Sequence, residues 1–153
     1  APNGTTTRAQ LVTMLYRQAG SPKAAKSSPF TDVTDSWSVD AINWAFEKGV
    51  VNGTSSTTFS PNDAITRQDM ATILYNYAKN VLDLDVYDTA DLTGYPDYSS
   101  ISDYARTPLS WAVAQGLILG VGNSNGVDTL QPKGDAPRAQ TATIIMRFCQ
   151  NVL

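Results

Sequence analysis

Apolar residues recur at helical spacing along this chain, and glycine or proline interrupts each run. The first run lies within residues 7–20 and ends near Gly20, and the second lies within residues 37–49 and ends at Gly49. A third run begins at Thr66. Glycine just beyond a run often closes a helix in the left-handed conformation. The pattern therefore predicts amphipathic helices joined by polar, glycine-bounded loops.

The stretch 65–75 has a close copy on either side, and the three copies are marked by Arg8, Arg67 and Arg138. The segments that precede the last two copies also correspond. Their matched positions are Phe30 and Tyr95, Asp32 and Asp97, Trp37 and Tyr104, Trp44 and Trp111, Gly49 and Gly116, Gly53 and Gly120, and Pro61 and Pro132. Recurrence of a whole helix-loop-helix unit predicts a repeat protein whose units bury their apolar faces against one another.

The repeats divide the chain into the second half of a first unit (1–20), a linker (21–29), a second unit (30–79), a solvated linker (80–94) and a third unit (95–153). We expect one compact domain. The first unit lacks its first half, so its helix has an apolar face without the helix that should cover it. Soluble monomers rarely leave such a face open. We therefore expect a second polypeptide, either an upstream fragment or another chain, to complete the first unit.

Composition excludes several functions. The chain has 153 residues, a net charge of −3 and no clustered Lys and Arg, which argues against nucleic acid as a partner. With no His and a single Cys149, it has no zinc-type ligand set and no imidazole base, so we expect no metal and no cofactor. No apolar run approaches the roughly 20 residues of a membrane span. Cys149 falls on the apolar side of the last helix and is expected to be buried.

The quoted motifs together resemble the S-layer homology domain, a family usually found as three tandem copies on bacterial cell-surface proteins. The resemblance rests on Phe30-x-Asp32, Trp37, the helix from Ala41 to Gly49, Gly49-Val-Val-Asn-Gly53, Phe59-x-Pro61 and Ile65-Thr66-Arg67-x-Asp69. It implies an all-α, pseudo-threefold bundle of helix-loop-helix repeats, secreted to the cell surface. It also implies binding of secondary cell-wall polysaccharide, which often carries pyruvyl ketals. A composition rich in Thr, Ser, Asn, Asp and Tyr agrees with an exported surface protein.

In this family a Thr-Arg-Ala-Glu motif lies in the grooves between repeats that receive the sugar. The three copies here read Thr7-Arg8-Ala9-Gln10, Thr66-Arg67-Gln68-Asp69 and Pro137-Arg138-Ala139-Gln140. None has the Glu, and the third has lost its Thr. Proline offers neither a hydroxyl nor an N–H for capping, so we expect the third site to be the weakest.

An Arg at the first helical position faces the positive end of the helix dipole, which is locally unfavourable and suggests a use. Free backbone N–H groups at the helix start and a guanidinium fork would together receive a carboxylate, such as that of a pyruvyl ketal. The alternative is structural: each Arg forms an ion pair between units with a carboxylate such as Asp32 or Asp97.

The candidate ligand-binding residues are Arg8, Arg67, Arg138, Thr7, Thr66, Asp69, Gln10, Gln140, Asp32, Asp97, Trp37, Tyr104, Gly53 and Gly120. Several have a structural interpretation as well. The rings of Trp37 and Tyr104 would either stack on a sugar or pack on the protein. The two Asp residues would accept sugar hydroxyls or cap the turn that directly follows each of them. The glycines would serve backbone conformations or allow a glycan to approach.

The sequence thus predicts a non-catalytic module that anchors a protein to the bacterial cell wall by binding an anionic polysaccharide. An assembly subunit that binds another protein chain is the alternative. A glycosidase is disfavoured, because it needs paired carboxylates and the chain's only Glu, Glu47, lies on a helix surface.

Overall fold

The computed structural model describes residues 4–120, 122 and 128–153. Its helices are α1 (Arg8–Gln18), α2 (Ser36–Glu47), α3 (Arg67–Asn80), α4 (Arg106–Ala114) and α5 (Arg138–Asn151), with short 3₁₀ turns at Tyr98–Ser100 and Asp103–Ala105. In these residues β structure is limited to isolated bridges. The predicted all-α class is confirmed, whereas the threefold arrangement of whole units and the unit boundaries stay predictions.

Side-chain caps from Thr7 and Thr66 start α1 and α3. The Thr7 hydroxyl accepts the N–H of Gln10 at 3.1 Å, and the Gln10 side chain accepts the N–H of Thr7 at 2.9 Å, which completes a capping box. The Thr66 hydroxyl accepts the N–H of Asp69 at 3.2 Å. Pro137 precedes α5 without a side-chain capping bond.

A closed ring of three backbone hydrogen bonds joins the segments that lead into α1, α3 and α5. The N–H of Ile65 donates to the carbonyl of Thr6 (2.7 Å), Thr6 donates to Ala136 (3.2 Å), and Ala136 donates back to Ile65 (3.0 Å). All three residues are buried. Because each occupies the same position before its repeat's arginine, the ring holds three equivalent helix starts together.

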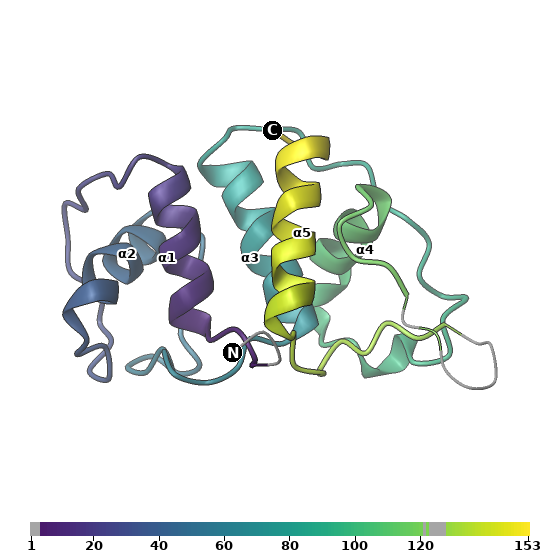
Figure 1. The fold of residues 1–153 in the computed structure, drawn as a ribbon, viewed down its shortest axis with the longest axis horizontal. Helices are drawn as coiled ribbons and strands as arrows, with labels where there is room; N and C mark the ends of the chain where they lie inside the picture. The colour runs from purple at the N-terminus through teal and green to yellow at the C-terminus, as the bar shows by residue number, and fades with distance from the viewer. Residues whose placement is uncertain (1–3, 121, 123–127) are drawn as a thin grey trace.

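The helices pair across the boundaries of the sequence repeats. Helix α2 of the second unit packs on α1 of the first, and α4 of the third unit packs on α3 of the second (Figure 1). A ring contact marks each pair, since Trp44 lies 5.5 Å from Tyr16 and Trp111 lies 5.7 Å from Tyr75, centroid to centroid. The two-helix unit seen in the sequence is therefore not the packing unit.

This pairing corrects the expectation that α1 has an open apolar face. Leu11, Val12 and Leu15 of α1 are at most 2% exposed, and α2 of the same chain packs along this helix. The reasoning that called for a second polypeptide at α1 was wrong, and nothing in the structure supports such a partner.

The helix without a paired neighbour is α5. Among the described helices, none lies along α5 as α2 lies along α1. Met146 is 51% exposed and Cys149 is exposed, whereas Tyr75 and Ala78 at the equivalent positions of α3 are partly and fully buried. The prediction that Cys149 is a buried thiol was therefore wrong, because no helix covers that side of α5.

The connection 80–94 is less solvated than expected. Val86 and Leu92 are buried in the common core, although Asp85 and Asp91 remain exposed and accept hydrogen bonds from backbone N–H groups two residues ahead. In the residues that the structure describes, no group of three or more acidic, Cys or His side chains is suited to hold a metal ion.

Asp32 and Asp97 hold equivalent turns. The Asp32 carboxylate accepts the N–H groups of Phe59 and Ser60, both at 2.9 Å, and Asp97 accepts those of Leu130 and Gln131 at 3.0 and 2.8 Å. Ser60 and Gln131 both have positive φ, at 57° and 49°, a conformation that residues other than glycine seldom adopt. The aspartates thus hold turns that lie 27–28 and 33–34 residues later in the chain, and not the directly following turns that the sequence suggested.

The four repeated glycines serve two different purposes. Gly49 and Gly116 follow α2 and α4 with φ of 71° and 72°, so they close these helices in the predicted left-handed conformation. Gly53 instead permits close packing, because a Cβ there would lie 2.4 Å from the Phe30 ring and 2.3 Å from the carbonyl oxygen of Ser55.

Replacing Gly53 with Ala is expected to lower the free energy of unfolding by about 2 kcal/mol, because the added methyl group overpacks the loop. Gly94→Ala is the matched control, since a Cβ at Gly94 meets nothing within 4 Å. Urea denaturation of both variants makes the comparison. Equal free energies of unfolding for the two variants would contradict this prediction, because the loop would then accommodate the added methyl group without loss of stability.

Asp32→Asn tests the turn. Burial by itself raises the pKa of Asp32. The hydrogen bonds from the N–H groups of Phe59 and Ser60 and the positive charge of Arg8 together lower this pKa by more than burial raises it, so it lies below the ordinary pKa of an Asp side chain. The carboxylate therefore stabilises the fold fully above about pH 4, and this contribution is lost as the pH falls through the lower folded-state pKa. We expect Asp32→Asn to lower the free energy of unfolding by about 1–2 kcal/mol near neutral pH.

The difference in free energy of unfolding between wild type and Asp32→Asn should be smaller at about pH 3 than near neutral pH, because pH 3 lies below the ordinary pKa of an Asp side chain. Urea denaturation at both pH values measures it, with Asp40→Asn on the exposed side of α2 as the control. If Asp32→Asn lowers the free energy of unfolding by the same amount at both pH values, the negative charge of Asp32 does not stabilise the turn.

Candidate ligand-binding grooves

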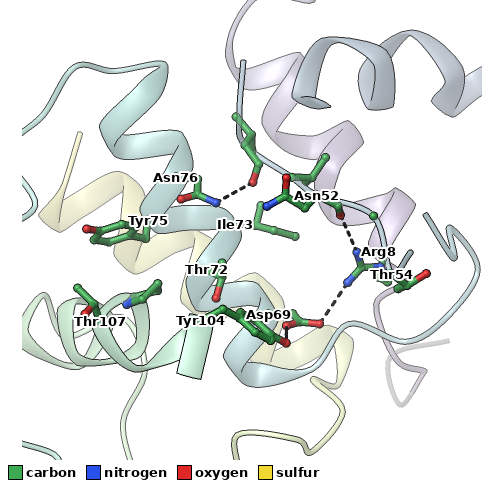
Figure 2. Close-up of a pocket in the computed structure, with 14 residues that line it drawn as sticks. Arg8, Asn52, Thr54, Asp69, Thr72, Ile73, Tyr75, Asn76, Tyr104 and Thr107 are labelled. Atoms are coloured by element: carbon green, nitrogen blue, oxygen red, sulfur yellow. Dashed lines mark hydrogen bonds and ion pairs between the residues drawn. The ribbon is translucent and has the colours of Figure 1, made fainter. Parts of the chain in front are cut away.

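A hollow that we call the Arg8 groove lies where α1, α3, the loop after α2 and the start of α4 meet (Figure 2). Its volume is about 810 Å³. Its lining residues are Arg8, Val50, Val51, Asn52, Gly53, Thr54, Asp69, Thr72, Ile73, Tyr75, Asn76, Tyr104, Thr107 and Pro108. Residues from all three sequence units therefore contribute to one groove.

Arg8 is held rigidly at one end of this groove. Its Nε donates to the carbonyl of Phe59 at 3.0 Å and its Nη2 to that of Asn52 at 3.5 Å, while Nη1 forms an ion pair with Asp69 at 3.2 Å. The guanidinium also lies 4.8 Å from the centroid of the Phe59 ring. The structural interpretation thus holds for Arg8, although its acidic partner is Asp69 and not Asp32.

Tyr104 completes this end of the groove from the segment before α4. Its hydroxyl donates to Asp69, on the oxygen that Arg8 does not contact. Burial of the hydroxyl, together with the hydrogen bond and the negative charge of Asp69, raises the pKa of Tyr104 to about 12. The phenol is therefore a proton donor at neutral pH, and the residue is still 58% exposed. Its ring remains accessible to a ligand.

A second hollow, the Arg67 groove, lies between α3, α5 and the segment after α4. It measures about 410 Å³ and is lined by Arg67, Leu117, Ile118, Leu119, Gly120, Ala139, Gln140, Thr143, Ile144 and Arg147. Arg67 donates to the carbonyls of Leu130 (Nε, 2.9 Å) and Leu119 (Nη2, 2.8 Å), and its Nη1 donates to the Gln140 side chain at 2.9 Å. Burial lowers the pKa of Arg67, and the charge of Asp97 opposes that effect.

A third hollow of about 340 Å³ lies between α1 and α5. Trp37, Gln10, Met14 and Arg138 are among its lining residues. Trp37, 49% exposed, thus lies in a different groove from Tyr104, its sequence equivalent. The Gln10 side chain is engaged in the cap of α1. The expected weakness of the third site stays a prediction.

The expected receptor of free backbone N–H groups is not present at α1 or α3. The N–H groups of Arg8 and Ala9 donate to the carbonyls of Asp63 and Pro61 at 2.9 and 3.0 Å. The equivalent groups of Arg67 and Gln68 donate to Gly134 and Pro132 at 3.0 and 2.8 Å. That part of the prediction was wrong, because the neighbouring repeat supplies acceptors for both helix starts. The guanidinium groups at these two helix starts are therefore not accompanied by free N–H groups of the first two helical residues.

The sequence analysis missed several lining residues, among them Asn52, Thr54, Thr72, Asn76, Thr107 and Arg147. Asn76 and Arg147 hold the same position after the repeated arginine, so the repeat alignment could have revealed them. Thr72 likewise matches Thr13 and Thr143 in the other copies, and each of these lines a hollow. Thr54 and Thr107 follow no pattern that distinguishes them from other surface threonines. Only the fold brings them to the groove.

Comparison with known proteins agrees with the repeats and the helical fold. The family model of the S-layer homology domain matches residues 29–71. Endoglucanase of Bacillus sp. (strain KSM-635) is 36% identical over 148 residues, which cover 95% of this chain and 15% of that protein. The surface-layer 125 kDa protein of Lysinibacillus sphaericus is 32% identical over 152 residues, covering 99% of this chain and 12% of that protein.

The Cellulosome-anchoring protein of Acetivibrio thermocellus is 27% identical over 151 residues, which cover 95% of this chain and 32% of that protein. The chain thus spans less than a third of these relatives. S-layer homology domains are non-catalytic modules that anchor surface proteins to the cell wall. Across the described residues, no helix is long and apolar enough to cross a membrane. The repeated helix starts, the helical fold and these matches together make this chain a member of the S-layer homology domain family.

Proposed function

We propose that this chain is the wall-anchoring module of a larger surface protein and that it binds an acidic secondary cell-wall polysaccharide, such as a pyruvylated one, in the grooves between its repeats. The observation that carries the proposal is that the same arginine-centred groove is built twice. In each groove a buried guanidinium is fixed by two backbone carbonyls beside an open hollow.

The lining of the Arg8 groove suits a sugar. Hydroxyl and amide groups of Thr54, Thr72, Asn76 and Thr107 lie around an apolar floor, and such groups can exchange hydrogen bonds with sugar hydroxyls. Tyr104 adds an accessible ring on which a sugar face can pack. Small-ligand sites are likewise concave and combine apolar surface with polar groups that fix the orientation of the ligand.

An assembly subunit that binds another protein chain is the second candidate. The observation in its favour is the exposed apolar side of α5, which includes Met146 and Cys149. A protein-binding role does not require wall polysaccharide. Removal of that polysaccharide therefore separates the two candidates.

The test is co-sedimentation with purified Gram-positive sacculi, before and after mild acid removal of the wall polysaccharide. We expect the chain to sediment with intact sacculi and to stay in solution with stripped ones. Arg67→Ala should reduce binding by about tenfold or more, the effect of losing one charge-assisted contact. Arg106→Ala is the matched control, because Arg106 is exposed, pairs with Asp103 and lies outside the two arginine-centred grooves.

Circular dichroism must show that Arg67→Ala remains folded, since Arg67 is 4% exposed and joins three segments. Tyr104→Ala, at an exposed position, is the second variant and should also weaken binding. Equal binding to intact and stripped sacculi would overturn the proposal.

A further inference from the structure

The two arginine-centred grooves share one framework. Arg8 and Arg67 each donate Nε to the carbonyl of the residue two positions before a repeated proline, and Nη2 to the carbonyl before a repeated glycine. Each donates Nη1 to the side chain two residues after the next repeat's arginine, Asp69 in one groove and Gln140 in the other. The frameworks can therefore be compared position by position.

The first difference lies at the Nη1 partner. Asp69 pairs its charge with that of Arg8, and the two side chains are only 10% and 23% exposed. Gln140 accepts the same hydrogen bond but carries no charge, so Arg67 has no ion-pair partner among the residues that the structure describes. A buried guanidinium without a counter-ion is costly. A bound anion would relieve that cost.

The second difference lies deeper in the hollow. Asn76 lines the Arg8 groove and donates to the carbonyl of Val50 at 3.2 Å. At the equivalent position Arg147 lines the Arg67 groove, and its Nη1 donates to the carbonyl of Leu117 at 3.5 Å, the same length as the contact from Arg8 to Asn52. The guanidinium of Arg147 thus lines the same hollow as that of Arg67, which has no ion-pair partner among the described residues.

Asp32 and Asp97 do not cancel this difference, because they act alike in the two frameworks. Asp97 acts on Arg67 as Asp32 acts on Arg8, and in both cases the carboxylate oxygens are occupied by two backbone N–H groups. Among the side chains lining each groove, the Arg8 groove has one positive and one negative charge, whereas the Arg67 groove has two positive charges and no negative one.

We infer that the Arg67 groove binds an oxyanion of the glycan, a carboxylate or a phosphate, through Arg67 and Arg147, while the Arg8 groove binds an uncharged part. The inference rests on the proposed function and goes further by dividing the two grooves between acidic and neutral parts of the ligand. The planar fork of arginine matches both kinds of oxyanion. Gln140 and Asp69 are then the residues that decide which groove is selective for charge.

The test uses two reciprocal substitutions and calorimetric titration with wall polysaccharide released from sacculi. Gln140→Glu gives Arg67 the counter-ion that Arg8 already has, and we expect it to weaken binding about tenfold or more. Asp69→Asn removes the counter-ion of Arg8 and should make binding of the acidic glycan more dependent on salt concentration, because it leaves a second guanidinium without an ion-pair partner. Arg147→Gln should weaken binding and reduce its dependence on salt concentration.

Weaker binding by Gln140→Glu would not be due to unfolding of the variant. Gln140 is exposed, and a glutamate there would gain an ion pair with Arg67, so its melting temperature should equal or exceed that of wild type. Chemical treatment of the polysaccharide identifies the anion. Reduction of carboxyl groups to alcohols should abolish the effect of Gln140→Glu if the anion is a carboxylate, and removal of phosphodiesters should do so if it is a phosphate.

Two results would overturn the inference alone: wild-type binding that survives both chemical treatments, or Gln140→Glu binding the native polysaccharide as tightly as wild type. A wild-type chain that does not bind the polysaccharide at all would instead overturn the proposed function, and the inference with it.

Discussion

The ring of backbone hydrogen bonds through Thr6, Ile65 and Ala136 is the constraint on which the rest of the structure depends. It draws together three segments that are far apart in the sequence, and each leads into a helix two residues later. Backbone groups buried in this way need partners, and here each segment supplies them to the next. The arginine that begins each helix therefore lies at a boundary between repeats and not on the outer surface of a single repeat.

The pairing of helices extends the same principle. Since α2 packs on α1 and α4 on α3, every arginine-centred groove combines side chains from different repeats. The carbonyls that hold Arg8 and Arg67 lie in the loop before the next repeat's final helix. The grooves are therefore rigid products of repeat packing, and a ligand bound in one would contact several repeats at once.

Repetition of the framework makes its differences informative. The backbone contacts of Arg8 recur around Arg67, so the change from Asp69 to Gln140 alters charge while the hydrogen bond is kept. The same applies to Asn76 and Arg147. A fold built from copies can in this way present similar hollows with different charge, without any change in the helices that form them.

The sequence by itself determined the helices, their caps and the repeated turns. Thr7 and Thr66 cap helices, Gly49 and Gly116 end them, and Trp44 and Trp111 are buried, because these effects depend on neighbours within a few residues or on the apolar face of one helix. The repeats and the Thr-Arg motif likewise pointed to the correct family and to arginines beside grooves.

Only the tertiary structure decided how these parts meet. The partner of Arg8 is Asp69 and not Asp32, and the N–H groups of the helix starts are occupied by a neighbouring repeat. Cys149 is exposed because none of the described helices lies along α5. Each of these outcomes depends on which distant segment packs against a given residue. Local patterns of polarity show that a face or a charge needs a partner, but the partner itself is chosen by the packing of the whole chain.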